Sequence, residues 1–190
     1  MRIAAVILAG GQSRRMGRDK ALVRLAGRPL LTHVQRALAP QVAALALSAN
    51  GDPARFAEFG LTVLPDHASM GPLSGVLAGL RWAAAQGAGA VVSAPVDAPF
   101  LPDDLVARLA EGGGAAPVLA ESGGVMHPAL GLWPVALAGA LEDFLASGAK
   151  ARVRDFALAQ GGRTVAFPDP ARFLNLNTPE DLAAAEARLA

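Results

Sequence analysis

Glycines and basic residues crowd into a short stretch directly behind an apolar run near the start of the chain. Residues 8–20 read LAGGQSRRMGRDK, with two adjacent glycines, two adjacent arginines and a lysine. Glycines let a backbone approach a ligand closely and expose its amide N–H groups to an anion. Arginine and lysine add positive charge, so phosphate is the anion that this stretch is predicted to bind. The alternative is a solvated loop whose glycines merely make a turn.

Two familiar phosphate-binding motifs do not fit this stretch. A P-loop requires G-x-x-x-x-G-K-[ST], whereas five residues separate Gly11 from Gly17 and Lys20 follows Gly17 by three. The dinucleotide fingerprint G-x-G-x-x-G is not supplied by GGQSRRMG either. The sequence therefore indicates a third type of phosphate loop.

An aspartate follows another apolar run, in SAPVDAPFLP at residues 93–102. Asp97 comes right after the expected strand, and Pro99 and Pro102 favour a rigid turn around it. One carboxylate beside a bound triphosphate can hold Mg²⁺, which keeps most of its waters. The alternative role is a helix N-cap, but Asp103 or Pro102 is better placed to start the following helix.

Further polar candidates lie near the ends of other expected strands. Asn50 sits in SANGDP, where Asn-Gly is also an ordinary turn, and Asp66 follows a short strand, where it is either a nucleotide ligand or a solvated loop residue. His127 precedes an expected strand, where a lone histidine is more often structural than catalytic. Asn175 and Asn177 alternate on an extended segment, so both side chains point the same way. Their amides suit recognition of a polar ring or a phosphate, or else satisfy backbone groups ahead of the last helix.

Short β-type runs alternate with longer helical patterns along the chain, and this alternation must position the candidates. It predicts an α/β fold, a three-layer α/β/α sandwich of Rossmann-like type with a mainly parallel sheet. Nearly continuous apolar runs such as AAVILA and AVVSA fit strands buried on both faces. In such sheets ligands sit at the carboxyl ends of the strands, where the basic loop and Asp97 are expected. The expected strands are Ile3–Leu8, Ala43–Ser48, Leu61–Leu64, Ala90–Ala94, Ala116–Leu119, Ala129–Trp133 and Arg163–Phe167.

The expected helices are Pro29–Leu38, Leu73–Gln86, Pro102–Ala110, Pro134–Ala146, Ala151–Ala159 and Pro179–Leu189. The last helix has a clear start signal, because Thr178 is a good N-cap and Pro179 suits the first helical position. Glu180 and Asp181 then face the positive end of the helix dipole.

Composition narrows the function classes. The 190 residues fit one domain, 1–190, and 17 basic against 16 acidic residues give a net charge of +1, which argues against general nucleic-acid binding. The absence of cysteine excludes disulfides, thiolate metal sites and a cysteine nucleophile. Apolar residues 3–9 fall far short of the ~20 that a membrane span needs, and no signal peptide is recognised, so a cytoplasmic protein is expected. The chain has two lysines, Lys20 and Lys150.

LAGGQSRRMGRDK resembles the signature loop of nucleotidyltransferases, L-A-G-G-x-S-x-R-M-G-x-D-K, and most resembles that of the molybdenum cofactor guanylyltransferases, the MobA family. The resemblance continues in the family's order through Asn50, PDHASMGPLSGVLAGL at 65–80, SAPVDAPFLP, HPALGLW at 127–133 and LNLNTPEDL at 174–182. Together these segments span nearly the whole chain.

The resemblance implies a Mg²⁺-dependent transfer of GMP from GTP to molybdopterin-bound molybdenum, with release of pyrophosphate. It implies that Arg15, Lys20 and Asp97 act in catalysis and that Asp97 holds the metal. It implies that the nucleotide is bound by Leu8, Ala9, Gly10, Gly11, Lys20, Asn50, Asp66 and Asp97. It implies that the pterin is bound by His127, Asn175 and Asn177. It also implies transient contacts with cofactor biosynthesis proteins or molybdoenzymes.

Three alternatives remain at this point. Relatives that transfer CMP typically carry L-A-A-G where this chain has LAGG, so the preference for guanine depends on Gly11. A sugar-phosphate nucleotidyltransferase shares the fold but usually has a larger C-terminal extension. A non-catalytic nucleotide-binding protein would be expected to lose charged positions such as Arg15, Lys20 and Asp97, which are all present.

Overall fold

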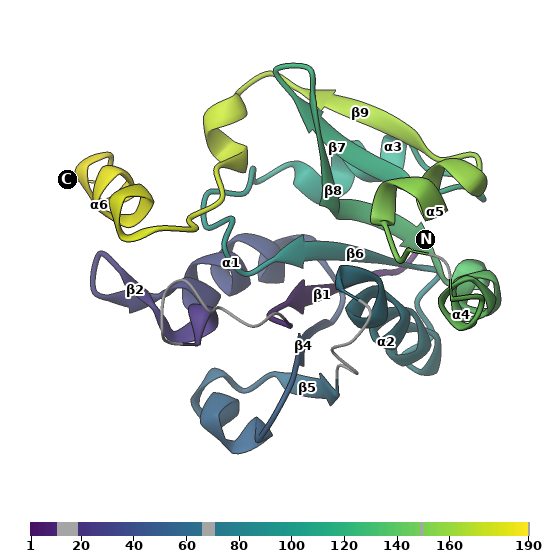
Figure 1. Cartoon of the computed structure of the whole chain (residues 1–190), viewed down its shortest axis with the longest axis horizontal. Coiled ribbons are helices and arrows are strands. Elements are labelled where there is room, and N and C mark those ends of the chain that lie inside the picture. Colours follow the sequence, from purple (N-terminus) through teal and green to yellow (C-terminus); the bar gives the residue numbers. More distant parts are fainter. Residues whose placement is uncertain (11–18, 66–70, 149, 190) are drawn as a thin grey trace.

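A seven-stranded sheet runs through the centre of the computed structural model, which describes residues 1–10, 19–65, 71–148 and 150–189. Its strand order is β5-β4-β1-β6-β8-β7-β9 (Figure 1). The strands are β1 (Ile3–Leu8), β4 (Leu45–Ala49), β5 (Thr62–Pro65), β6 (Ala90–Pro95), β7 (Val118–Ser122), β8 (Val125–Pro134) and β9 (Arg163–Phe167).

The mainly parallel sheet predicted from the sequence is confirmed. β5, β4, β1 and β6 are parallel to one another, and β9 is parallel to β7. Helices connect most of these strands, as parallel neighbours require.

β8 is the exception, since it runs antiparallel to both β6 and β7. The strand expected at Ala116–Leu119 is shifted toward the C-terminus, to Val118–Ser122, and the one expected at Ala129–Trp133 extends further at both ends. The two form a hairpin closed by Gly123 and Gly124, whose φ angles are +56° and +77°. A two-residue turn with positive φ at both positions joins antiparallel strands directly. His127, expected ahead of a strand, therefore lies inside β8.

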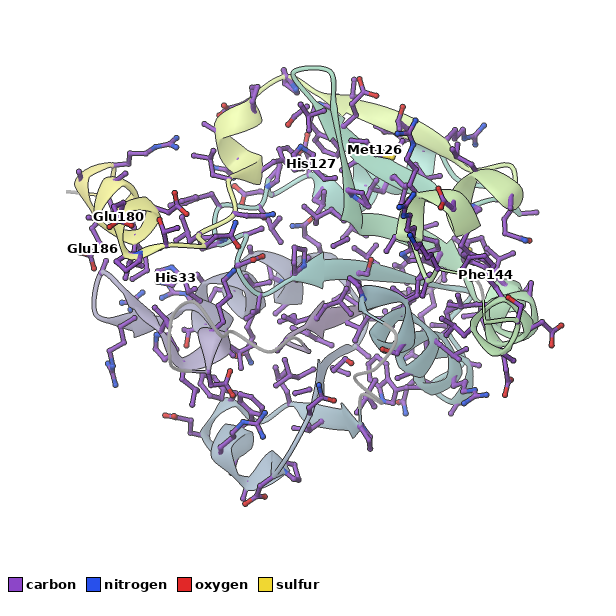
Figure 2. The ribbon with its side chains drawn as sticks, viewed as in Figure 1. His33, Met126, His127, Phe144, Glu180 and Glu186 are labelled. Atoms are coloured by element: carbon purple, nitrogen blue, oxygen red, sulfur yellow. The ribbon has the colours of Figure 1, made fainter. Side chains whose placement is uncertain are left out.

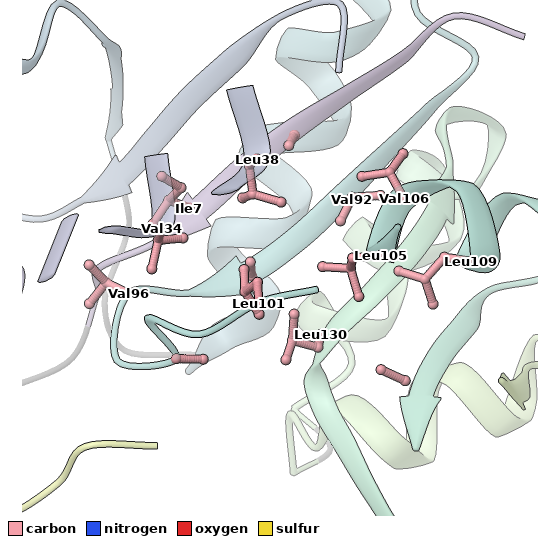
Figure 3. Packing of buried hydrophobic residues seen from close by; sticks show 14 of the residues in the cluster. Ile7, Val34, Leu38, Val92, Val96, Leu101, Leu105, Val106, Leu109 and Leu130 are labelled. Carbon is pink, nitrogen blue, oxygen red and sulfur yellow. The ribbon is translucent and has the colours of Figure 1, made fainter. Parts of the chain in front are cut away.

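Helices cover both faces of the sheet, which confirms the predicted three-layer sandwich. α1 (Leu30–Leu38) and α3 (Leu105–Glu111) cover one face, and Figure 3 shows side chains of α1 near Ile7 of β1 and side chains of α3 near Val92 of β6, all in one core cluster. α2 (Pro72–Ala85), α4 (Ala138–Ala146) and α5 (Val153–Ala159) cover the other face, where Val6 and Leu8 of β1 point. Successive β1 residues thus enter opposite cores, because both faces of this strand are buried.

α6 (Pro179–Ala187) lies away from the sheet, against a small hairpin of β2 (Arg24–Leu25) and β3 (Arg28–Pro29). The two share a minor core of Leu25, Leu30, Leu176 and Ala185. Glu186, labelled in Figure 2, accepts a hydrogen bond from the Ala26 N–H at 3.1 Å. This hairpin is not predictable from the sequence pattern, because two-residue strands are too short to show a periodicity.

Short 3₁₀ helices were also absent from the expected elements. They are η1 (Lys20–Leu22), η2 (Ala39–Gln41), η3 (Pro53–Phe59), η5 (Val135–Leu137) and η6 (Pro170–Phe173). No helix of the described ranges is both long enough and apolar enough to cross a membrane.

Two glycines let α2 lie unusually close to the sheet. A Cβ added at Gly79 would lie 2.7 Å from Val6 Cγ1, and one added at Gly75 would lie 2.8 Å from Leu8 Cδ2 and from Ser48 Oγ. Real Cβ atoms do not approach that closely, so the helix and strands fit only when both positions are glycine. The start of α2 is thereby held near the carboxyl ends of β1 and β4.

We expect Gly79→Ala to lower the free energy of unfolding. Overpacking costs about 1–3 kcal/mol, which exceeds the roughly 0.5–1 kcal/mol that alanine gains over glycine within a helix. Gly139 in α4 is the matched control, since no atom lies within 4 Å of its added Cβ. Urea unfolding should show Gly139→Ala stabilised by about 0.5–1 kcal/mol. Equal effects of the two changes would contradict the close packing of α2.

Candidate active site

The parallel strands β5, β4, β1 and β6 end at one edge of the sheet, and the candidate residues follow them. Ala9 and Gly10 follow β1, Asn50 follows β4, and Asp97 lies two residues past β6. Backbone hydrogen bonds hold this edge together, from the Ala9 N–H to the Ser48 carbonyl at 2.8 Å and from the Val96 N–H to the Leu8 carbonyl at 3.1 Å. Gly11, Arg15 and Asp66 lie outside the described residues.

Three of the predicted residues meet at this edge around one ammonium group. Lys20 Nζ lies 2.5 Å from Asp97 Oδ2 and 2.7 Å from Asn177 Oδ1. The side chains of Lys20 and Asp97 are 18% and 17% exposed, so water and salt screen this ion pair less than a surface pair. Lys20 begins η1, Asp97 follows β6, and Asn177 precedes α6. Segments far apart in the sequence thus assemble a cation beside a carboxylate.

The turn that carries Asp97 is fixed from several sides. The Leu176 N–H donates to the Asp97 carbonyl at 2.9 Å, which ties the C-terminal segment to the turn. The Gln41 side chain donates to the Pro102 carbonyl at 3.0 Å, and Arg172 donates to the Leu101 carbonyl at 3.1 Å. These contacts hold the carboxylate in place before any ligand binds.

Asp97 does not cap the next helix. The residue at the N-cap of α3 is Asp104, so Asp103 and Pro102, considered for that position from the sequence, both lie ahead of it. Asp97 is therefore not needed for the start of α3.

Two buried oxygens at this edge, Asp97 Oδ1 and Asn50 Oδ1, have no hydrogen-bond partner among the described residues. Buried polar atoms are nearly always hydrogen-bonded, so these acceptors are suited to groups that a ligand brings. Asp97 Oδ1 fits a hard cation such as Mg²⁺, which prefers oxygen ligands. Within the described ranges no cluster of three or more His, Asp or Glu side chains is placed to hold a metal.

His127 contacts the C-terminal segment rather than the Lys20 group. Its Nε2 lies 2.7 Å from Ser122 Oγ, and its ring stacks on Phe173 with centroids 4.9 Å apart (Figure 2 labels His127). Burial lowers the pKa of His127, which favours the neutral imidazole near pH 7. The observed contacts of His127 thus support the segment that leads to Asn175 and Asn177.

The segment after Phe173 alternates as the sequence predicted. Leu176 is buried, whereas Asn175 and Asn177 on either side of it are exposed. Of the two asparagines, Asn177 contacts Lys20. Asn175 makes no side-chain hydrogen bond with the part of the chain that the structure describes.

A capping box fixes the backbone of Asn177. Thr178 Oγ1 accepts from the Asp181 N–H at 3.1 Å, which confirms Thr178 as the N-cap of α6. Asp181 Oδ2 accepts in return from the N–H groups of Asn177 and Thr178 at 2.8 and 2.9 Å. These two backbone hydrogen bonds lower the pKa of the Asp181 carboxyl, the bond from Asn177 first.

Two residues that were not among the predicted site residues, Asp19 and Arg55, support Lys20. Asp19 Oδ1 accepts from the Ala21 N–H at 3.1 Å and so caps η1, while Asp19 Oδ2 accepts from Arg55 Nε at 2.7 Å. The cap was readable in principle, because aspartate is a favoured N-cap residue. The arginine was not, because it lies 36 residues further along the chain.

Comparison with known families identifies the kind of domain. The sequence model of a family described as "MobA-like NTP transferase domain" matches residues 5–163. A molybdenum cofactor guanylyltransferase of Cereibacter sphaeroides is 60% identical over 190 residues, which cover 100% of this chain and 98% of that protein. A molybdenum cofactor guanylyltransferase of Acidiphilium cryptum is 55% identical, covering 97% of this chain and 94% of the relative.

Solved structures share the fold. A molybdopterin-guanine dinucleotide biosynthesis protein A from Archaeoglobus fulgidus has a TM-score of 0.75 at 24% identity, covering 100% of this chain and 98% of its own. A 4-diphosphocytidyl-2C-methyl-D-erythritol synthase from Anaerococcus prevotii has a TM-score of 0.77 at 14% identity, covering 99% and 96%. At these identities the likeness shows the α/β architecture alone.

Asp181 is expected to stabilise the fold in a pH-dependent way. Its pKa in the folded chain lies below the unfolded value of about 4, so its contribution is present above that value and is lost as the pH falls through the folded pKa. Urea unfolding should therefore show a deficit of Asp181→Asn that is constant from pH 7 to 5 and shrinks below pH ~4. Glu180→Gln, also in the first turn, is the control and should show a much smaller deficit. A deficit for Asp181→Asn that persists unchanged at low pH would contradict the capping role.

Proposed function

The chain belongs to the MobA-like NTP transferase domain family, and we propose that it transfers GMP from GTP to molybdenum-bound molybdopterin, forming the guanine dinucleotide cofactor and pyrophosphate. The observation that carries the proposal is the full-length similarity to relatives named molybdenum cofactor guanylyltransferase, at 60% and 55% identity. The geometry supports it, since an ammonium and a carboxylate lie together at the carboxyl edge of the sheet.

In the proposed reaction, an oxygen of the terminal pterin phosphate attacks the α-phosphorus of GTP in line. A new oxygen–phosphorus bond forms, the bond from the α-phosphorus to the bridging oxygen breaks, and pyrophosphate leaves with that electron pair. A nucleophile that is already an anionic phosphate needs little help from a general base. Catalysis then consists of positioning two anions and neutralising charge on the leaving pyrophosphate.

The residues divide these tasks. Lys20, held by Asp97 and Asn177, neutralises phosphate charge from a fixed position, and Arg15, outside the described residues, adds a second cation. In the proposal, the backbone of Leu8, Ala9 and Gly10 faces the triphosphate, and Gly11, outside the described residues, is assigned to the nucleotide as well. Asn50 Oδ1, a buried acceptor without a partner among the described residues, accepts from the base or ribose, as does Asp66 in the proposal.

Mg²⁺ is part of the proposal. Asp97 would hold it through the oxygen that Lys20 does not contact, and bound Mg²⁺ supplies positive charge to the triphosphate. Lys20 and Mg²⁺ would then both supply positive charge beside the triphosphate, from opposite oxygens of the same carboxylate.

The pterin side of the site is proposed from the C-terminal segment. Asn175 and Asn177 present amides from exposed positions, and His127 stacks on Phe173 at the start of the same segment. The product leaves through transient contacts with cofactor biosynthesis proteins or molybdoenzymes.

Pyrophosphate release in the presence of Mg²⁺ tests the reaction. We expect release with GTP only when molybdenum-loaded molybdopterin is present, and much slower release with CTP under the same conditions. A preference for CTP would replace the proposal with cytidylyl transfer. No release with either nucleotide would favour a nucleotide-binding protein without catalysis.

Lys20→Ala is expected to lower turnover by a factor on the order of 10²–10³, the usual effect of losing one charge-stabilising donor. Asp97→Asn should lower turnover as strongly and raise the Mg²⁺ concentration needed for half-maximal rate. Lys150→Ala, which changes the chain's other, exposed lysine, is the control and should behave as wild type. Normal turnover by Lys20→Ala would contradict the assigned site, provided that thermal unfolding shows all three variants folded.

A further inference from the structure

Arg55 reaches from η3 into the site and joins two loops that are separate in the sequence. Its guanidinium donates from Nε to Asp19 Oδ2 at 2.7 Å and from a terminal nitrogen to the Asp52 carbonyl at 2.6 Å. The other terminal nitrogen donates to the Asn50 carbonyl. One side chain thus binds the loop after β4, which carries Asn50, and the turn that carries Lys20.

The guanidinium itself is fixed by its surroundings. It lies over the Phe56 ring with Cζ 4.3 Å from the centroid, and Phe56 is 1% exposed. A Cβ at Gly51 would lie 3.2 Å from a terminal nitrogen of Arg55, and Gly51 has a φ of +73° that favours glycine. The Phe56 ring and the close Gly51 backbone leave the planar group little freedom.

Asp19 carries the link to Lys20. One of its oxygens accepts from Arg55, and the other accepts from the Ala21 N–H and caps η1, whose first residue is Lys20. The orientation of the lysine turn therefore depends on a carboxylate that Arg55 holds in place.

We infer that Arg55 is a positioning residue, which acts through Asp19 to couple the Asn50 loop to Lys20. This inference rests on the proposed function, in which Asn50 contacts the base or ribose and Lys20 contacts the phosphates. The bridge through Arg55 and Asp19 would then set the positions of both contacts. The Asp19 and Arg55 side chains are 27% and 30% exposed, and an ion pair with such exposure adds little to stability. The bridge instead fixes the position of the Lys20 turn relative to the Asn50 loop.

Arg55→Gln and Asp19→Asn, singly and together, test the bridge. Thermal unfolding should change little, whereas the Kd for Mg-GTP should rise about tenfold and kcat should fall about tenfold in each single variant. The double variant should be no worse than the more affected single variant, because both changes remove the same bridge. Arg55→Lys should not restore activity, since an ammonium lacks the planar fork that spans three acceptors.

Arg81→Gln is the matched control. Arg81 pairs with Glu142 at 2.5 Å on α2 and α4, with both side chains more than half exposed, and its loss should leave Kd and kcat unchanged. Three results would overturn the inference: single variants within twofold of wild type, effects that multiply in the double variant, or restored activity in Arg55→Lys. A wild-type chain that neither binds nor turns over GTP would instead overturn the proposed function. An active wild type with unaffected variants overturns the bridge alone.

Discussion

The ion pair between Lys20 and Asp97 is the constraint to which the rest of the site is fitted. A partly desolvated ammonium is costly unless it is paired, and here it has a carboxylate at 2.5 Å and an amide oxygen at 2.7 Å. The parallel sheet provides the carboxylate, because the carboxyl ends of β1, β4 and β6 meet at one edge. The backbone bond from Leu176 to Asp97 then brings the amide of Asn177 to the same point.

Most of the structure around this point serves to fix backbone rather than to supply chemistry. The capping box of α6 fixes the backbone of Asn177. The side chains of Gln41 and Arg172 fix the turn after Asp97, and α2 packs closely against the strands that carry the loops. Rigid support of this kind matters for phosphoryl transfer, in which positioning and fixed charge account for most of the catalysis. In the proposal, few side chains contact the nucleotide, and many other residues hold those side chains in position.

Much of this arrangement could be predicted from the sequence, because its signals are local or periodic. Apolar runs gave the central strands, and Thr178 and Pro179 gave the start of the last helix. The hairpin of β7 and β8 was not predicted, because the polar residues at the ends of both strands interrupt the apolar pattern on either side of the Gly-Gly turn. The bridge from Arg55 to Asp19 escaped because it depends on side chains 36 residues apart, a separation that no local pattern encodes. The roles expected of residues 11–18 and of Asp66, which lie outside the described residues, stay predictions.

The bond between Leu176 and Asp97 has a consequence for how the protein is made. Lys20 and Asp97 lie 77 residues apart and are synthesised early, whereas Asn177 follows Lys20 by 157 residues. On the ribosome, the strands β5, β4, β1 and β6 emerge before the segment that covers their edge. A nascent chain therefore has these four strands before it has its complete site, and Lys20 cannot gain the contact with Asn177 until translation has passed residue 177.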